Sequence, residues 1–297
     1  MKPAPFDYFA PTELSEALAL LAQHGDEAKI LAGGQSLMPM LNMRLATPQV
    51  VIDVNRITAL DYLAPRPDGG LAIGALARQR QLERASLVQK QQPVLAAALP
   101  FIGHFQIRNR GTIGGSLVHS DPAAELPAVS AALEAEFVVQ SAQGQRVVAA
   151  EDFFVTYLTT AIEPDEILTE IRLPAWPSGW GWGIQEVCRR EGDFALVGAV
   201  SLLQVDPDSV CQSVRLALFG VDGTPVRIRQ AEDALVGQRV DDNALREVEQ
   251  IVAAELDPES DIHASATYRK EVGGVMARRT LAQALDRAQG RTGRGPA

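Results

Sequence analysis

Apolar residues in the first half of the chain alternate between helical spacing and short continuous runs. Leu14, Leu18 and Leu21 share one face of a predicted helix, for which Thr12 is a suitable N-cap and Gly25 a stop. Runs of β-branched and apolar residues predict strands, so this half begins as a small βαβ-like unit. The other elements expected here are strands at 29–32, 50–54, 71–75 and 167–173, a hairpin of 137–139 with 146–148, and helices at 37–44, 79–86, 93–101 and 126–136.

The order of elements changes after residues 174–179, where two prolines and a glycine predict a linker. The aromatic and glycine run at 179–183 is interpreted as part of that linker. Three strands and then three helices are expected beyond it, an order typical of an α+β domain. The expected strands are 183–189, 195–205 and 213–219, and the expected helices are 229–235, 242–256 and 266–288.

These patterns predict an α+β protein of two domains. The N-terminal domain is expected at 1–176 and the C-terminal domain at 180–288. The tail at 289–297 is rich in glycine and arginine and is expected to be flexible.

Charge and cysteine content exclude several classes of function. The net charge of −10 disfavours a nucleic-acid-binding protein, which normally carries a basic face. No apolar run reaches membrane-spanning length and no export signal is visible, so a cytoplasmic location is expected. Cys188 and Cys211 are too few for an iron–sulfur cluster or a disulfide scaffold, and the four histidines lack the spacing of a zinc site.

Two diglycine segments are the strongest candidates for ligand binding. Residues 33–36 read Gly-Gly-Gln-Ser, and residues 112–116 read Thr-Ile-Gly-Gly-Ser within 103–122, which is expected to be a long loop. Successive N–H groups in such turns converge on a point and bind anions, and glycine lets a ligand approach the backbone closely. Two facing corners of this kind suit a diphosphate. The alternative is that each is only a turn, although the presence of two favours a cofactor role.

The usual nucleotide and hydrolase motifs are absent. The sequence has no G-x-G-x-x-G after a strand, no G-x-x-x-x-G-K-[ST] and no G-x-S-x-G. These absences disfavour a Rossmann dehydrogenase, a P-loop NTPase and a serine hydrolase.

The diglycine segments and their surroundings resemble the FAD-binding medium subunits of the molybdenum hydroxylase family, of the carbon monoxide dehydrogenase and xanthine dehydrogenase type. The resemblance covers nearly the whole chain in order, including its C-terminal helix. The most specific segments are AGGQSLMP at 32–39, QIRNRGTIGGSLVHSDPAAELP at 106–127, EILTEIRLP at 166–174 and RREGDFA at 189–195.

The resemblance implies the fold and the cofactor contacts. The fold expected is a PCMH or vanillyl-alcohol-oxidase-type FAD-binding domain of two lobes, at about 1–57 and 58–176, followed by a small domain with a three-stranded sheet and helices. Gln185 matches a position that is often lysine in eukaryotic relatives, so its contact is in doubt, and Arg189 or Arg190 is an alternative. The implied FAD contacts are Ile30, Leu31, Ala32, Gly33, Gly34, Gln35, Ser36, Leu37, Ile102, Thr112, Ile113, Gly114, Gly115, Ser116, Glu125, Leu168 and Gln185.

The resemblance also implies partners and a role in electron transfer. A large subunit would carry the molybdenum–pterin cofactor and a small subunit two [2Fe–2S] clusters, in a dimer of heterotrimers. This chain would hold FAD, pass electrons to an external acceptor, and contribute no metal ligand and no acid–base residue to the substrate. The sequence leaves open the organic substrate and whether the acceptor is NAD, a quinone, a cytochrome or oxygen.

Two other functions are consistent with the same residues. One is a stand-alone flavin oxidoreductase of the same fold, and the other is a scaffold that has lost its flavin. Intact glycine pairs disfavour the scaffold, and the C-terminal domain looks like a docking module rather than a substrate pocket. We expect Gly114→Val to abolish FAD retention while leaving the fold largely intact.

Several polar residues near these segments allow a structural or a functional interpretation. Asp53 is expected to cap a turn or pair with Asn55, and Asp121 to cap the next helix. His119 either approaches the flavin or shapes its loop. Arg108 and Arg110 either face a partner or are solvated.

Overall fold

The computed structural model describes residues 1–291, and the contacts between residues group them into two compact units, each assembled from several stretches of chain. The first unit comprises Met1–Ala85, His104–Ser120 and Glu134–Pro174. The second comprises Ser86–Gly103, Asp121–Leu133 and the described residues from Ala175 onward. Because both units are discontinuous, the contiguous domains 1–176 and 180–288 stay a prediction.

The tail expected to be flexible falls largely outside the described residues. Residues 292–297 lie outside them. Gln289 is described, and its side-chain amide donates a hydrogen bond of 2.7 Å to the Ser209 hydroxyl.

A small parallel sheet opens the first unit and confirms the βαβ-like prediction. Its strands are β1 (Asp7–Phe9), β2 (Ala28–Leu31) and β3 (Val50–Asp53), in the order β1-β3-β2. Helix α1 (Leu14–His24) packs on it and buries Ala17, Leu18 and Leu21. The predicted cap is one residue off, because the N-cap position belongs to Glu13 and Thr12 lies outside the helix.

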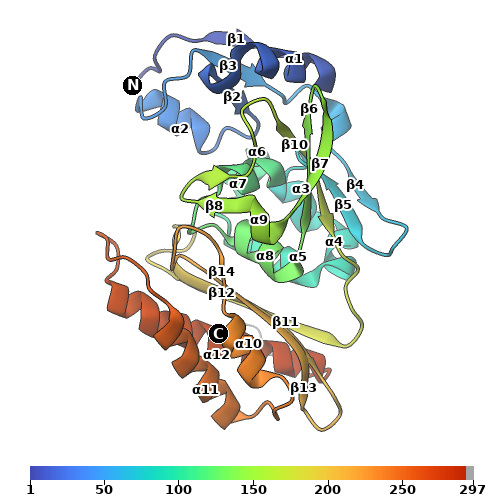
Figure 1. The fold of residues 1–297 in the computed structure, drawn as a ribbon, viewed down its shortest axis with the longest axis vertical. Coiled ribbons are helices and arrows are strands. Elements are labelled where there is room, and N and C mark those ends of the chain that lie inside the picture. The colour runs from blue at the N-terminus through green and yellow to red at the C-terminus, as the bar shows by residue number, and fades with distance from the viewer. Residues whose placement is uncertain (292–297) are drawn as a thin grey trace. The chain divides into compact units, whose positions relative to one another are not determined.

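A five-stranded antiparallel sheet forms the larger part of the first unit, in the order β4-β5-β10-β6-β7 (Figure 1). The predicted hairpin of β6 and β7 and the strand β10 at its centre are confirmed. The rings of Phe137 and Phe153 are tilted by 38° to each other, with centroids 4.1 Å apart, and both side chains are fully buried. The strands are β4 (Leu63–Pro65), β5 (Leu71–Gly74), β6 (Glu136–Ser141), β7 (Gly144–Ala149) and β10 (Ile167–Leu173).

Helices occupy the segment 103–122, where the sequence predicts a long loop. α6 (Phe105–Arg110) and α7 (Ile113–His119) lie there, joined at Gly111. The Thr112 hydroxyl caps α7 by accepting the N–H of Gly115 at 3.0 Å, which offsets the low helix propensity of glycine. The unit also contains α2 (Leu37–Asn42), α3 (Gln79–Arg84), α9 (Ala150–Phe153), β8 (Phe154–Thr156), β9 (Thr159–Thr160) and 3-10 turns at Gly25–Glu27 and Thr58–Leu60.

The second unit is built on an antiparallel sheet of three long strands and one short strand. The strands are β11 (Trp180–Cys188), β12 (Ala195–Val205), β13 (Cys211–Phe219) and the two-residue β14 (Val226–Arg227). The interpretation of 179–183 as a linker is wrong, because β11 begins at Trp180. Its glycines let helix α12 approach, since a Cβ at Gly183 would lie 2.0 Å from the carbonyl oxygen of Thr280.

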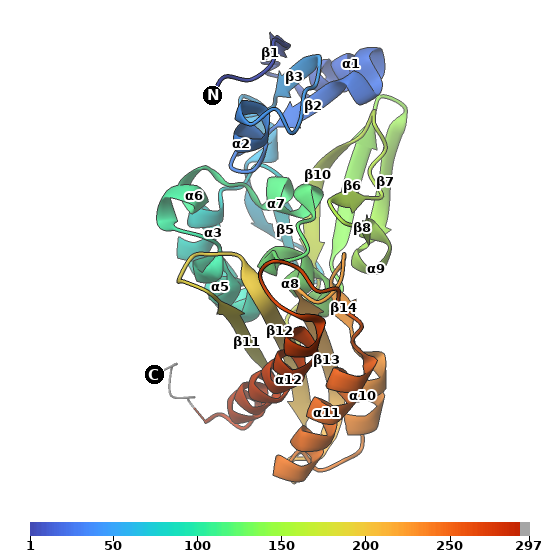
Figure 2. The ribbon, with the colours of Figure 1, turned by 90° about the vertical axis from the view of Figure 1, so that its left-hand side faces the viewer.

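Helices α10 (Arg229–Leu235), α11 (Asp242–Glu255) and α12 (Ala266–Ala288) follow the sheet, as predicted. α11 and α12 lie side by side, and α12 packs along β11 and β12 on one face of the sheet (Figures 1 and 2). The unit also contains α4 (Ser86–Gln91), α5 (Pro93–Ala98), a 3-10 turn at Leu99–Phe101 and α8 (Glu125–Leu133). Within residues 1–291, no helix combines the length and apolarity that crossing a membrane requires.

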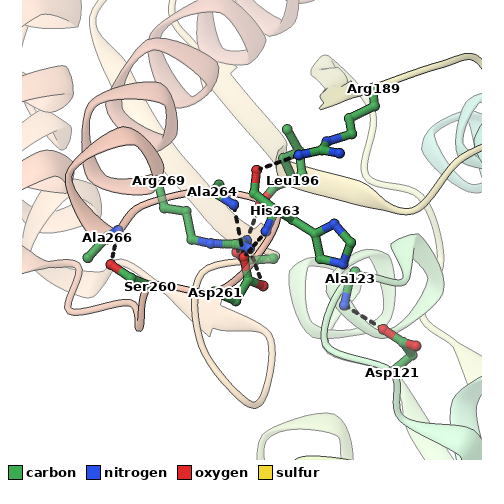
Figure 3. Close-up of polar contacts among 11 residues, drawn as sticks. Asp121, Ala123, Arg189, Leu196, Ser260, Asp261, His263, Ala264, Ala266 and Arg269 are labelled. Atoms are coloured by element: carbon green, nitrogen blue, oxygen red, sulfur yellow. Dashed lines mark hydrogen bonds and ion pairs between the residues drawn. The ribbon is translucent and has the colours of Figure 1, made fainter.

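Arg269 joins three segments of the second unit (Figure 3). Its guanidinium donates to the carbonyl oxygens of Leu196, at 2.6 Å, and Gly220, at 2.5 Å, which lie at the start of β12 and just after β13. It also pairs with Asp261 at 2.8 Å, in the loop before α12. Backbone N–H groups of that loop hold the pKa of Asp261 down at about 2. Arg269 is buried, so these bonds lie largely out of water.

We predict that Arg269→Met lowers the free energy of unfolding by about 2 kcal/mol, because two buried carbonyl groups lose their donor. Arg279→Met is the matched control, since Arg279 lies on the same helix and is exposed. It should change the free energy of unfolding by less than about 0.5 kcal/mol. Chemical denaturation measures both, and equal effects would contradict the structural role of Arg269.

Candidate functional site

The two diglycine segments lie against each other in the first unit. A Cβ at Gly33 would lie 2.6 Å from the carbonyl oxygen of Arg110 and 2.8 Å from the Cα of Gly111. A Cβ at Gly115 would lie 3.7 Å from that of Ala32. The segments therefore share one corner of the unit, and only glycine at position 33 permits their approach.

The first segment presents a row of unused backbone donors. Among the contacts of residues 1–291, the N–H groups of Gly33, Gly34, Gln35 and Ser36 make no hydrogen bond. Gly34 has a φ of +72°, a left-handed conformation that glycine adopts without strain, between the end of β2 and the start of α2. Consecutive free N–H groups around such a residue form an anion-binding nest.

The second segment has a different role from the one the sequence suggests. The N–H groups of residues 113–116 are already used. Ile113 donates to the carbonyl oxygen of Ala77 at 3.0 Å and Gly114 to that of Ala75 at 2.9 Å, while Gly115 donates to the Thr112 hydroxyl and Ser116 to the Thr112 carbonyl oxygen. Segment 112–116 thus packs against the first segment. The prediction that both diglycine segments offer a full set of free N–H groups to an anion is corrected, because most N–H groups of the second segment are bonded within the protein.

Asn55 and Arg78 connect the two segments through side chains. The Asn55 amide donates to the carbonyl oxygen of Ala32 at 2.7 Å, and its own oxygen accepts from Arg78 at 2.6 Å. Arg78 also donates to the carbonyl oxygen of Arg110 at 2.5 Å. Burial lowers the pKa of the Arg78 guanidinium, and the positive charge of the nearby Arg110 lowers this pKa further. Positive charge is therefore concentrated beside the first segment.

The Asn55–Arg78 connection is missed by the sequence analysis. Arg78 lies between β5 and α3, far from either glycine pair in sequence, and no local motif includes it. Asn55 is interpreted there only as a partner of Asp53. That part is confirmed, because the backbone N–H of Asn55 donates to the Asp53 carboxylate at 2.9 Å.

Most other expected contacts of the first unit lie in the same corner. Ile30 and Leu31 end β2, directly before the nest. Leu168 is buried at a bulge of β10, next to Thr169, whose carbonyl oxygen accepts the N–H of Ala75 at 3.0 Å. Since Ala75 in turn accepts from Gly114, a continuous backbone contact links Leu168 to α7.

Three expected contacts belong to the second unit. Ile102 follows the 3-10 turn at Leu99–Phe101, and Glu125 is buried in the first turn of α8. Gln185 lies in β11 opposite Ala199, whose side chain is in the core packed under α12. Directly opposite residues share a face of a sheet, so Gln185 lies on the α12 face.

Apart from Asp53, two of the four remaining polar candidates have a clear structural role. Arg108 is buried and pairs with Glu83 at 2.9 Å, so its interpretation as a partner-facing or solvated charge is wrong. Asp121 accepts the N–H of Ala123 at 2.9 Å in the turn before α8 (Figure 3). His119 is the last residue of α7, and Arg110 is exposed at the end of α6.

The free amides of residues 33–36, the adjoining segment 112–116 and the nearby Arg78 guanidinium form a corner suited to a diphosphate or a similar anion. FAD fits the corner, since its diphosphate needs the close backbone approach that the glycines allow.

Comparison with known families identifies the cofactor. Residues 4–176 match the family "FAD binding domain in molybdopterin dehydrogenase", and residues 183–284 match "CO dehydrogenase flavoprotein C-terminal domain". The chain therefore belongs to the family of FAD-binding medium subunits of molybdenum hydroxylases, and it is the flavoprotein subunit of an oxidoreductase.

Relatives match over nearly their full length. The chain is 40% identical to the 6-hydroxypseudooxynicotine dehydrogenase complex subunit alpha of Paenarthrobacter nicotinovorans, over 97% of each chain. It is 39% identical to the caffeine dehydrogenase subunit beta of Pseudomonas sp. strain CBB1, again over 97% of each. A carbon monoxide dehydrogenase structure from Hydrogenophaga pseudoflava superposes with a TM-score of 0.93 and 38% identity, over 97% of this chain and 99% of the other.

We predict that Gly115→Val weakens FAD binding about a hundredfold, because its methyl groups extend into the corner toward Ala32. Its Cβ would also lie 2.7 Å from the Thr112 hydroxyl, so the helix cap is disturbed at a cost of about 1 kcal/mol. Gly115→Ala is the control, since it disturbs the cap equally but adds one methyl group, and its affinity should fall less than about tenfold. Flavin fluorescence titration measures both, and equal losses would contradict the assignment.

We predict that Gly114→Val destabilises the fold, whereas the sequence alone predicts that this substitution leaves the fold largely intact. A Cβ there would lie 2.6 Å from the carbonyl oxygen of Ala75 and 2.9 Å from its Cα, both backbone atoms. The substitution should therefore destabilise the first unit by about 3 kcal/mol, and the fold would not stay intact. Thermal unfolding of the FAD-free chain checks this prediction. An unchanged Tm would contradict it, because it would show that the backbone around Ala75 and Gly114 shifts at little cost.

Proposed function

We propose that this chain relays electrons from iron–sulfur clusters of a partner subunit to an external acceptor, and that residues 33–36 hold the FAD diphosphate for that purpose. FAD supplies the chemistry, because it accepts electrons singly and releases them in pairs. The observation that carries the proposal is the row of free N–H groups on Gly33 to Ser36. The close approach of Gly33 to the backbone at 110–112 supports it.

The roles of the chain's residues follow from their geometry. The amides of 33–36 bind the diphosphate, and Gln35 orders the turn by donating to the carbonyl oxygen of Gly33 at 2.9 Å. Asn55 and Arg78 keep the nest against the end of α6, and the Arg78 charge favours an anion there. The remaining contacts in the predicted set, including Ile102, Leu168, Glu125 and Gln185, are proposed for the rest of the cofactor.

The proposed partners are a large molybdenum subunit and a small subunit with two [2Fe–2S] clusters, in a dimer of heterotrimers. The family membership supports this, since relatives are named as subunits or medium chains of dehydrogenases. Among residues 1–291, no group of histidine, cysteine, aspartate and glutamate side chains is suited to a metal ion, which supports locating the metal centres on partners. A stand-alone flavin enzyme is the alternative, and near-complete coverage of complex subunits disfavours it.

The test is cofactor and metal analysis of the native complex, purified through this chain. We predict that two partner subunits copurify with FAD, molybdenum and iron. The same purification with Gly115→Val should retain both partners and both metals but lose FAD. A chain that purifies alone, retains FAD and oxidises a substrate without partners would contradict the proposal.

A further inference from the structure

Arg78 lies in a stretch of backbone that is held on both sides within the first unit. Ala75, which directly follows β5, donates its N–H to the carbonyl oxygen of Thr169 in β10 at 3.0 Å. Arg78 itself pairs with Thr112 in an isolated antiparallel bridge, and the backbone on either side of it bonds to segment 111–113. The Arg78 side chain therefore extends from a fixed point between the five-stranded sheet and the second diglycine segment.

The side chain of Asn55 can take only one orientation. Its amide nitrogen donates to the carbonyl oxygen of Ala32 at 2.7 Å and to the Asp53 carboxylate at 2.6 Å. A flipped amide would place its oxygen against these two acceptors, so the oxygen is directed at Arg78, whose Nη2 lies 2.6 Å away. Asn55 thereby fixes the end of β2, from which the nest at 33–36 continues, to the guanidinium of Arg78.

The guanidinium of Arg78 bonds to two segments with two different nitrogens. Nη2 donates to Asn55, and Nη1 donates to the carbonyl oxygen of Arg110 at 2.5 Å. A Cβ at Gly33 would lie 2.6 Å from that same carbonyl oxygen. Arg78 thus holds both sides of the contact at which the nest meets the end of α6. Because a guanidinium is planar, it keeps its two acceptors at a fixed separation, whereas a lysine ammonium is a single point charge on a flexible stem.

We propose that Arg78 is a positioning residue for FAD, and that its forked guanidinium, acting through Asn55, sets the affinity of the nest for the diphosphate. The proposal rests on the proposed function, in which the amides of 33–36 bind that diphosphate. Both terminal nitrogens of the guanidinium are used by protein oxygens, so the geometry of the fork contributes more than its positive charge. A nest that is already ordered loses less free energy when the anion binds.

The first experiment separates geometry from charge by measuring the FAD dissociation constants of Arg78→Lys and Arg78→Met. We expect Arg78→Lys, which keeps the charge but loses the fork, to raise the dissociation constant about tenfold. Arg78→Met should raise it by no more than about threefold beyond that. Arg84→Lys and Arg84→Met are the matched controls, because Arg84 is exposed at the end of α3, and each should change the constant less than about twofold. Unchanged affinity in Arg78→Lys, with a loss only in Arg78→Met, would overturn the proposal in favour of charge alone.

A second measurement separates a positioning role from a general loss of structure. We expect the Tm of the FAD-free Arg78→Lys chain to fall by less than about 3 °C, because Arg78 is only half-buried. The dissociation constant of riboflavin, which lacks the diphosphate, should stay within about twofold of its value in the unmodified chain. A large fall in Tm, or an equal loss of affinity for riboflavin and FAD, would overturn the positioning role.

A double-mutant cycle tests whether Asn55 and Arg78 act together. Asn55→Ala removes the acceptor of Arg78 and the donor to Ala32, so we expect it to raise the FAD dissociation constant about tenfold. The combination with Arg78→Lys should lose no more than about twofold beyond the larger single loss, because both substitutions break the same connection. Losses that multiply would overturn the Asn55–Arg78 connection as the means by which Arg78 acts.

A chain that binds no FAD would contradict the proposed function instead. The Asn55–Arg78 connection would then be decided in the FAD-free chain by the amide NMR signals of residues 33–36. We expect these signals to move in Arg78→Lys and in Asn55→Ala and to stay in place in Arg84→Lys. Signals that do not move in Arg78→Lys would show that the nest keeps its position without the fork, and the proposal would be wrong.

Discussion

The structure of the first unit depends on the close approach of residue 33 to the backbone at 110–112. A Cβ at Gly33 would lie 2.6 Å from a carbonyl oxygen, so any side chain there would force the two segments apart. Their approach frees the N–H groups of 33–36 from every partner in the described chain while holding them in a fixed corner. Preorganised donors bind an anion without first having to be ordered, which is why this contact matters more than any single hydrogen bond.

Glycines also allow close packing in the second unit, where they bring a helix and an aromatic ring against the sheet. Gly181 and Gly183 let α12 lie directly on β11, and Gly198 makes room for the ring of Phe219. In each case the glycine is needed for packing rather than for a turn.

The long regular elements could be predicted from the sequence. The corner shared by segments 33–36 and 112–116 could be predicted only in part. The strand at 195–205 and the helices at 229–235 and 266–288 have the predicted bounds, because their apolar periodicity is sustained. Segments rich in glycine were misjudged: 103–122 contains two helices and 179–183 begins a strand. Local propensity disfavours glycine in both, and tertiary contact with Ala75 and with α12 outweighs it. The Asn55–Arg78 connection joins residues distant in sequence and has no local signal.

Hydrogen–deuterium exchange at the amides of Gly33 to Ser36 tests the central claim most directly, with FAD compared against riboflavin, which lacks the diphosphate. The account predicts fast exchange in the free chain, strong protection by FAD and little protection by riboflavin. The amides of 113–116 should be protected in all three states, because they are already bonded within the protein. Unchanged exchange at 33–36 in the FAD-saturated chain would contradict the account.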